Sequence, residues 1–201
     1  REYLPGHGYL TDSGTLNSKN AAAFLRLVGE RETNILRNRI RKEADQKRRL
    51  RPPEARMADD GSDPYSDAAQ TRYMDEYYRE KLRIDRQTEP EKMRALVDNY
   101  VEGLSWVLQY YYQGCQSWDW YFRYLYAPYI QDVPRFMSAD FRPTYTMGIP
   151  FRPIEQLMSV LPPRSKDCVP PEFHALMTDP DSPIKEFYPQ TIEIDLNGHK
   201  F

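Results

Sequence analysis

Two long stretches of the chain carry apolar residues at the three- and four-residue steps of an amphipathic helix. The first stretch follows a turn around residues 12–14 and begins near Leu16. Its apolar positions are Phe24, Leu27, Val28, Ile35, Leu36 and Ile40. This spacing predicts a helix that reaches about residue 40. Gly29 lies inside it and costs about 1 kcal/mol relative to alanine.

The second stretch gives the clearest helical pattern. Thr88 and Glu91 have the spacing of a capping box, in which each side chain bonds the other residue's backbone N–H, and Pro90 suits a first helical turn. The apolar positions that follow are Met93, Leu96, Val97, Tyr100, Val101, Leu104, Val107, Leu108 and Tyr111. Gly114 then supplies a C-terminal stop. At 1.5 Å per residue we expect a helix of about 40 Å, packed on more than one side. A shorter helix is expected at residues 68–82.

Proline interrupts the chain throughout the part beyond residue 114. Only brief helices fit there, at residues 153–160 and 171–177, and each is opened by proline. Residues 191–195 alternate like a strand. The aromatic-rich extended chain between these elements predicts a segment that wraps over another surface and does not form its own sheet. The expected fold is mainly α, with one long central helix, shorter helices, proline-rich extended segments and little sheet.

Charge is distributed unevenly, although the formal net charge is only −2. Residues 37–56 contain nine basic and three acidic side chains. Such a run can contact nucleic acid or serve as a nuclear-import signal, and a solvated helix end leading into a linker is at least as good an interpretation. Residues 51–67 have no apolar period and collect Pro, Asp, Ser and Gly, which predicts a mobile linker.

The sequence contains no complete catalytic constellation. The acidic candidates for metal binding are better explained as turn or strand-face residues, and they are Asp140, Asp179, Asp181, Glu193 and Asp195. The three histidines are scattered, and no phosphate-binding or nucleophile motif occurs. Cys115 and Cys168 predict neither a zinc site nor a disulfide framework. No apolar run approaches the roughly 20 residues of a membrane span.

Aromatic residues are concentrated at residues 117–129, which read SWDWYFRYLYAPY. Aromatic rings beside a basic residue can stack on nucleobases, with about 1–3 kcal/mol per base. Buried aromatic residues also dominate protein interiors. Residue types alone leave both interpretations open and favour the core.

The same segment carries a resemblance to a known family. Residues 100–121, YVEGLSWVLQYYYQGCQSWDWY, resemble the hallmark of the second conserved region of the XRN family of 5′→3′ exoribonucleases. The blocks PFRPIEQLMSVLP at residues 150–162 and LMTDPDSPI at residues 176–184 continue the match, in the family's order. Residues 8–17, GYLTDSGTLN, are similar to the junction after the first conserved region and look closer to the nuclear Rat-type branch.

The resemblance implies a division of the chain and a function for it. Residues 1–40 are expected to be a helical junction after the first conserved region, residues 41–70 a charged flexible linker, and residues 71–201 the second conserved region, all part of a larger α/β nuclease core. Family members degrade RNA processively from a 5′-monophosphate end with Mg²⁺. The acidic residues that hold the metal belong to the first conserved region and precede this chain, so the chain alone is expected to be inactive, with no catalytic residue or metal ligand of its own.

The resemblance also implies site residues and partners. In the family this region narrows the active-site entrance, and one of its tryptophans stacks on the 5′-terminal base. Trp118 and Trp120 both match the family's motif, and Trp118 is the preferred candidate. Arg123 is a candidate for contact with the RNA backbone. The expected partners are single-stranded RNA and the N-terminal nuclease region, without a membrane, and the expected location is the nucleus, or else the cytoplasm. Leu125 stands where the family commonly has histidine, which puts any role of that histidine in doubt. The alternative is a non-catalytic protein-interaction module derived from the family.

Overall fold

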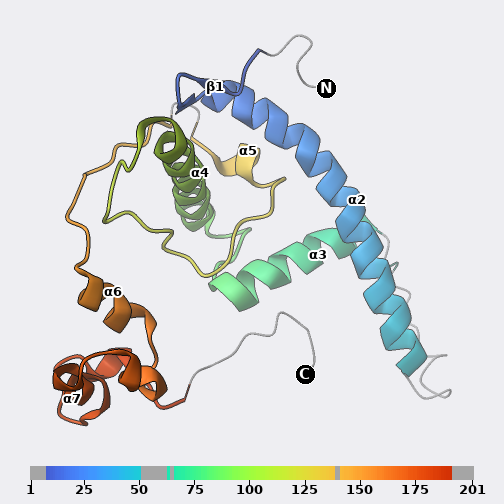
Figure 1. Ribbon diagram of the computed structural model, residues 1–201. Coiled ribbons are helices and arrows are strands. Elements are labelled where there is room, and N and C mark those ends of the chain that lie inside the picture. Colours follow the sequence, from blue (N-terminus) through green and yellow to red (C-terminus); the bar gives the residue numbers. More distant parts are fainter. Residues whose placement is uncertain (1–7, 51–62, 64–65, 139–140, 192–201) are drawn as a thin grey trace. The chain divides into compact units, whose positions relative to one another are not determined.

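The computed structural model describes residues 8–50, 63, 66–138 and 141–191 (Figure 1). The chain divides into two compact units, residues 1–148 and 149–201. Within the described residues the only strands are β1 (Thr11–Asp12) and β2 (Thr15–Leu16), and the other regular elements are helical. The predicted mainly helical fold with little sheet is therefore confirmed.

A short hairpin precedes the first helix. β1 and β2 pair antiparallel, with Thr11 opposite Leu16 and Asp12 opposite Thr15. The two residues of the turn, Ser13 and Gly14, both have positive φ, as two-residue hairpins that follow the strand twist require. Asn17 then accepts the backbone N–H of Asn20 at 3.1 Å, which satisfies one of the free donors at the start of the next helix.

The first long helix, α2 (Ser18–Leu50), extends ten residues beyond the predicted end at residue 40. The predicted linker at residues 41–70 is wrong at both ends, because residues 41–50 belong to α2 and helix α3 begins at Asp67. Its middle, at residues 51–62, 64 and 65, lies outside the described residues. Residues 41–50 contain no glycine or proline and consist mostly of strong helix formers. Arg39 forms an ion pair with Glu43, one turn further on, at 3.0 Å. The basic side chains of the last turn also stabilise the helix, because they lie at the negative end of its dipole.

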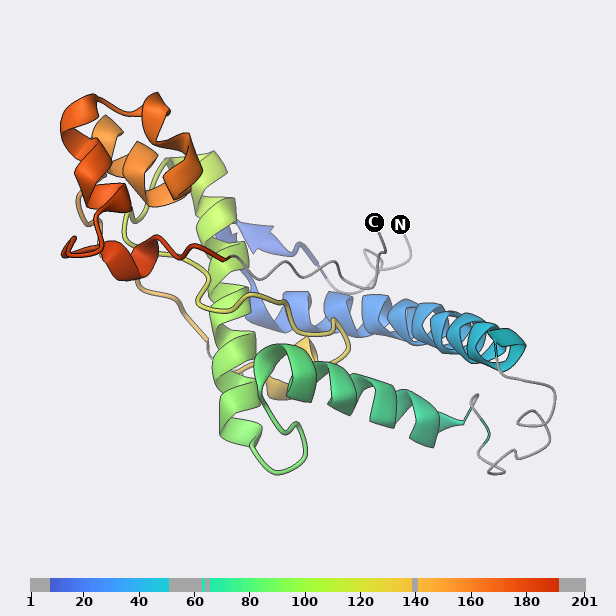
Figure 2. The same ribbon diagram turned by 90° about the horizontal axis from the view of Figure 1, so that it is seen from below.

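Helix α3 (Asp67–Tyr77) is capped by Ser66, whose hydroxyl accepts the backbone N–H of Ala69 at 3.1 Å. It continues as a π-helical turn, η2 (Tyr78–Leu82), so the predicted helix at residues 68–82 is confirmed. The Tyr73 hydroxyl donates to Glu43 at 3.2 Å, so α3 meets α2 in the basic half of that helix. In Figure 2, α4 runs across the direction of both α2 and α3.

Helix α4 (Pro90–Gln113) confirms the predicted helix and its stop at Gly114, but the predicted capping box is wrong. The N-cap is Glu89, and no side chain bonds the first free N–H groups. Thr88 instead donates its backbone N–H to Asp85 at 3.1 Å, and Glu89 accepts the backbone N–H of Asp85 at 2.9 Å. Asp85 thus forms a local turn that takes Thr88 away from the capping position.

The same bonds make this turn sensitive to acid. Backbone N–H groups of Thr88 and Gln87 lower the pKa of Asp85, and the hydrogen bond from Lys92, followed by that from the Asp85 backbone, lowers the pKa of Glu89. Because both pKa values are depressed in the fold, the stabilisation is present above the unfolded values near 4 and is lost as pH falls through the lower folded values.

We therefore expect the backbone amides of Gln87 and Thr88 to lose protection from hydrogen exchange below about pH 4. Asp85→Asn keeps an oxygen that accepts N–H bonds but does not titrate, so it should remove most of this pH dependence. Protection factors measured by NMR as a function of pH check the prediction. Constant protection of both amides down to about pH 2 in the unmodified chain is the contradicting outcome.

The core of the first unit is built around α4. One face of α4 is fully buried at Met93, Leu96, Val97 and Val101, and packs against residues that come from both sides of it in the sequence. These partners are Tyr78, Ile84 and Val133. Val133 begins the short helix α5 (Val133–Phe136).

Gly29 has a packing role that the sequence did not indicate. A Cβ at this position would lie 2.9 Å from the Cα of Gln131, so only glycine lets α2 approach the chain here. One turn further on, the Glu32 carboxylate accepts the backbone N–H groups of Ile130 and Gln131, each at 3.0 Å. The close approach and the carboxylate together join α2 to the chain just before α5.

A buried ion pair anchors the same part of the chain. The Asp132 carboxylate accepts two N–H groups of Arg86, at 3.1 and 3.2 Å, and the hydroxyl of Tyr78 at 2.9 Å. Arg86 also donates to Asp75 at 3.0 Å, and the Tyr78 oxygen accepts the backbone N–H of Tyr129 at 2.9 Å. Burial raises the pKa of Asp132, and the charge of Arg86 opposes that shift. The network ties the turn after η2 to the start of α5.

The second unit consists of brief helices, as predicted for proline-interrupted chain. They are α6 (Pro153–Val160), η3 (Pro163–Cys168), η4 (Pro171–Phe173), α7 (His174–Thr178) and η5 (Lys185–Phe187). The core of the unit is formed by Val169, Met177 and Tyr188. The strand-like alternation predicted at residues 191–195 lies outside the described residues beyond Thr191.

Candidate nucleic-acid interface

The aromatic segment after α4 is extended and alternates between two environments. Trp120, Phe122, Tyr124 and Tyr126 are half-buried, whereas Tyr121, Arg123, Leu125 and Ala127 are exposed. This period of two is that of an extended backbone lying on a surface. Hydrogen bonds hold the segment at two points: Arg123 donates its backbone N–H to Asn99 of α4 at 2.9 Å, and the Tyr77 hydroxyl of α3 donates to the Ala127 carbonyl at 2.8 Å. The predicted wrapping over another surface is confirmed.

Trp120 faces inward and is part of a stack of three rings. Its ring lies 6.0 Å from that of Trp106, at an interplanar angle of 20°, and the Trp106 ring lies 5.4 Å from that of Tyr110, at 11°. A Cβ at Gly103 would lie 2.7 Å from the far edge of the Trp120 ring, so glycine makes the space for this ring against α4. The Trp120 indole N–H is buried and has no hydrogen-bond partner among the described residues.

Trp118 faces solvent and has no such stack. Its side chain is 55% exposed, and no aromatic ring in the described part of the chain is paired with it. Buried Ser117, just before it, accepts the backbone N–H groups of Asp119 and Trp120 on its hydroxyl oxygen, at 3.2 and 3.0 Å. The structure therefore gives the two tryptophans different environments, although they are only two positions apart in the sequence.

Arg123 and Leu125 lie on the outward side of the same extended segment. Arg123 is exposed. Leu125 is 92% exposed and is among the most exposed of the large apolar side chains. An outward apolar side chain of this kind contributes nothing to the core on which the segment lies. Packing within the described residues therefore does not account for a leucine at this position.

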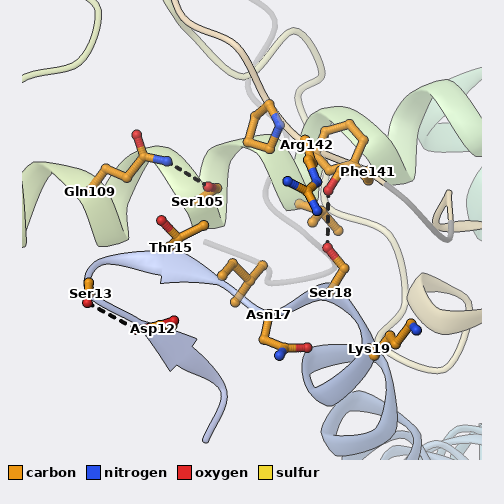
Figure 3. Close-up of a pocket in the computed structure, with 13 residues that line it drawn as sticks. Asp12, Ser13, Thr15, Asn17, Ser18, Lys19, Ser105, Gln109, Phe141 and Arg142 are labelled. Carbon is orange, nitrogen blue, oxygen red and sulfur yellow. Dashed lines mark hydrogen bonds between the residues drawn. The ribbon is translucent and has the colours of Figure 1, made fainter.

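A cavity of about 780 Å³ lies elsewhere in the first unit, between the β1–β2 hairpin, the start of α2, the middle of α4 and residues 141–143 (Figure 3). Its lining includes the cationic side chains of Lys19 and Arg142 and the acidic Asp12. In Figure 3, Gln109 donates to Ser105 on the α4 side of the cavity. Sequence reasoning missed this cavity, because its walls come from three segments that are far apart in the chain and no motif marks them. None of the predicted site residues lines it.

The described residues contain no group of three or more His, Cys, Asp and Glu side chains placed to hold a metal ion. Asp179 accepts the backbone N–H of Asp181 at 2.9 Å, in agreement with the interpretation of these two as turn residues. Asp140, Glu193 and Asp195 lie outside the described residues.

The remaining candidate groups have structural contacts. A ring nitrogen of His174 lies 2.9 Å from the carbonyl oxygen of Val169. The Cys115 thiol donates to the Ser117 carbonyl at 3.3 Å, and both cysteines are free thiols. No helix among the described residues is long and apolar enough to cross a membrane.

These features define a class of protein, a mainly helical domain that presents an aromatic surface and no assembled catalytic group within its described residues. The chain belongs to the family described as the Xrn1 helical domain, whose family model matches residues 67–201. The predicted membership in the XRN family is therefore confirmed.

Several curated proteins are similar to this chain. The 5′-3′ exoribonuclease 1 of Schizosaccharomyces pombe is 50% identical over 126 residues, which is 63% of this chain and 9% of that protein. The 5′-3′ exoribonuclease 1 of Saccharomyces cerevisiae is 48% identical over 127 residues, 63% of this chain and 8% of that protein. The 5′-3′ exoribonuclease 2 of S. pombe is 49% identical over 129 residues, 64% of this chain and 13% of that protein. The matched part thus spans about a tenth of these relatives, and its identity to the two types is nearly equal.

Proposed function

We propose that this chain forms part of the catalytic core of a 5′→3′ exoribonuclease that acts on 5′-monophosphorylated single-stranded RNA. In this role it shapes the entrance to the active site and stacks on the 5′-terminal base. Support comes from the family match and from relatives that are named as 5′-3′ exoribonucleases.

The observation that carries the proposal is the exposure of Trp118. A base can stack only on a ring whose face is accessible, and base–aromatic stacking contributes about 1–3 kcal/mol per base. Trp118 is 55% exposed, whereas the ring of Trp120 is already stacked on Trp106. We therefore assign the 5′-base contact to Trp118 and a packing role to Trp120. The exposed Arg123 is proposed to contact the RNA backbone.

The metal of the proposed reaction is expected to be Mg²⁺, which takes oxygen ligands and in such sites is held by carboxylates together with the substrate. The described carboxylates do not fit this ion. Asp132 is enclosed by Arg86 and Tyr78, and Asp179 bonds the backbone of its own turn. We propose that residues outside this chain hold the metal, and that the chain by itself does not hydrolyse RNA.

The N-terminal nuclease region of the same protein is the proposed partner of the exposed apolar surface. On α4, Leu104, Val107 and Tyr111 are exposed although they belong to the apolar positions of the helix. Such side chains suit contact with another folded region. The same surface also favours the second candidate, a protein-interaction module without catalysis; in that case substitution of Trp118 would leave RNA binding unchanged.

A nuclear location is proposed, with the cytoplasm as the alternative. The support is the similarity of residues 8–17 to the Rat-type branch and the basic run, whose Lys47, Arg48 and Arg49 are exposed at the end of α2. A basic cluster on an exposed helix end is accessible to an import receptor.

Replacing Trp118 by alanine is expected to weaken binding of 5′-monophosphorylated single-stranded RNA by the full-length protein about tenfold, because the stacking surface is removed. Trp118→Phe keeps a ring and should retain most of the affinity. Leu125→Ala is the matched control for loss of an exposed apolar side chain outside the proposed contact. Fluorescence anisotropy with a labelled oligonucleotide measures the effect. Equal affinity of Trp118→Ala and the unmodified protein would remove the proposed role.

A further inference from the structure

The peptide group between Ser117 and Trp118 is held at both of its ends. On one side, the Ser117 carbonyl accepts the indole N–H of Trp106, on α4, at 3.2 Å, and also the weaker thiol donor of Cys115 at 3.3 Å. On the other side, the Trp118 backbone N–H donates to the Met147 carbonyl at 2.7 Å. A peptide group is planar, so bonds in opposite directions at its carbonyl and its N–H fix its orientation. That orientation constrains the direction in which the Trp118 side chain leaves the backbone.

The donor on α4 is itself rigidly placed. The Trp106 ring is stacked between Trp120 and Tyr110, with ring centroids 6.0 and 5.4 Å away. Such stacking restricts rotation of the ring, and so the indole N–H points in one direction. Trp106 is only half-buried, yet its indole N–H makes a hydrogen bond. The indole N–H of Trp120 is buried and has no hydrogen-bond partner among the described residues.

The acceptor on the other side is also held against α4. The Tyr145 hydroxyl donates to the backbone carbonyl of Glu102 at 2.6 Å, two residues before Met147. Burial raises the pKa of Tyr145 to about 12, so this hydroxyl keeps its proton at neutral pH and remains a donor. The bond from Trp106 and the bond to Met147 therefore both involve chain that is fixed on the same helix.

We infer that Trp106 is a positioning residue for Trp118: its indole N–H, bonded to the Ser117 carbonyl, holds the exposed Trp118 ring in one orientation for stacking on a nucleobase. The effect on RNA affinity rests on the proposed function, whereas the fixed orientation of the Trp118 ring does not. A preoriented ring loses less conformational freedom on binding, and so the effect appears in RNA affinity.

The test uses Trp106→Phe, which keeps an aromatic ring in the stack and removes the N–H. The backbone amide of Trp118 should lose about tenfold in hydrogen-exchange protection, because the indole bond is gone and the carbonyl keeps only the weak thiol donor of Cys115. Trp120→Phe is the matched control in the same stack; it removes an indole N–H that has no described partner, and Trp118 protection should stay within about twofold.

The second readout is RNA affinity of the full-length protein for a 5′-monophosphorylated single-stranded oligonucleotide. Trp106→Phe should weaken it about fivefold, and Tyr110→Phe, which alters the other end of the stack, should leave it unchanged. If Trp106 acts through Trp118, the double variant Trp106→Phe/Trp118→Ala should bind no more weakly than Trp118→Ala alone.

The outcomes separate the inference from the proposed function. Unchanged protection of the Trp118 amide in Trp106→Phe overturns the inference whatever the RNA result. Additive losses of affinity in the double variant also overturn it, while leaving the proposed function intact. If Trp118→Ala itself leaves affinity unchanged, the proposed function fails, and the exchange experiment alone then decides whether Trp106 holds this peptide.

Discussion

Replacing Arg86 by alanine is expected to destabilise the first unit by about 3–5 kcal/mol, because removal of one partner leaves buried carboxylates without their counter-charge. The Arg86 side chain is 8% exposed and that of Asp132 is 2% exposed, so water cannot replace the missing bonds. Arg86 also bonds Asp75, so both acidic side chains lose their cationic partner in this one variant.

Urea unfolding followed by tryptophan fluorescence measures this loss. All three tryptophans, at positions 106, 118 and 120, lie in the first unit, so their signal reports on that unit. The matched control is Arg39→Ala, which breaks an exposed pair with Glu43 and should change the free energy of unfolding by no more than about 0.5 kcal/mol. Similar losses in the two variants would show that the buried network does not hold the fold.

Replacing Trp120 by alanine is expected to cost about 2–4 kcal/mol of stability, whereas Trp118→Ala should cost less than about 1 kcal/mol. The difference follows from packing, because Trp120 fills the space next to Gly103 and stacks on Trp106. The exposed ring of Trp118 leaves no comparable cavity when it is removed. Urea unfolding followed by circular dichroism avoids the change in fluorescence that both substitutions cause.

Gly103→Ala tests the same packing from the other side. The added Cβ would lie 2.7 Å from the Trp120 ring, so the ring has to move, and the expected loss is about 1–3 kcal/mol. Trp120→Phe shortens the ring and should relieve part of that loss in the double variant. A larger loss of stability for Trp118→Ala than for Trp120→Ala would reverse the assignment of the two residues.

Much of the helical architecture could be predicted because its signals are local. The apolar period of α4, the proline at its start and Gly114 at its end act within a few residues of one another. The prediction for Thr88 failed because the Asp85 carboxylate accepts the Thr88 backbone N–H that the Glu91 side chain was expected to bond, and pattern spacing does not rank such competitors. The extension of α2 to Leu50 was missed because a charged segment without an apolar face was interpreted as linker.

The sequence by itself determined the helical class, the places where proline opens short helices and the resemblance that the family match confirms. Only the tertiary structure decided which tryptophan is exposed, why Gly29 and Gly103 are glycines, and that Arg86 reaches Asp132. The physical reason is distance along the chain. Exposure, close approach and ion pairing depend on contacts between residues 17 to 102 positions apart in these cases, and a local pattern carries no information about which distant surface will cover a side chain.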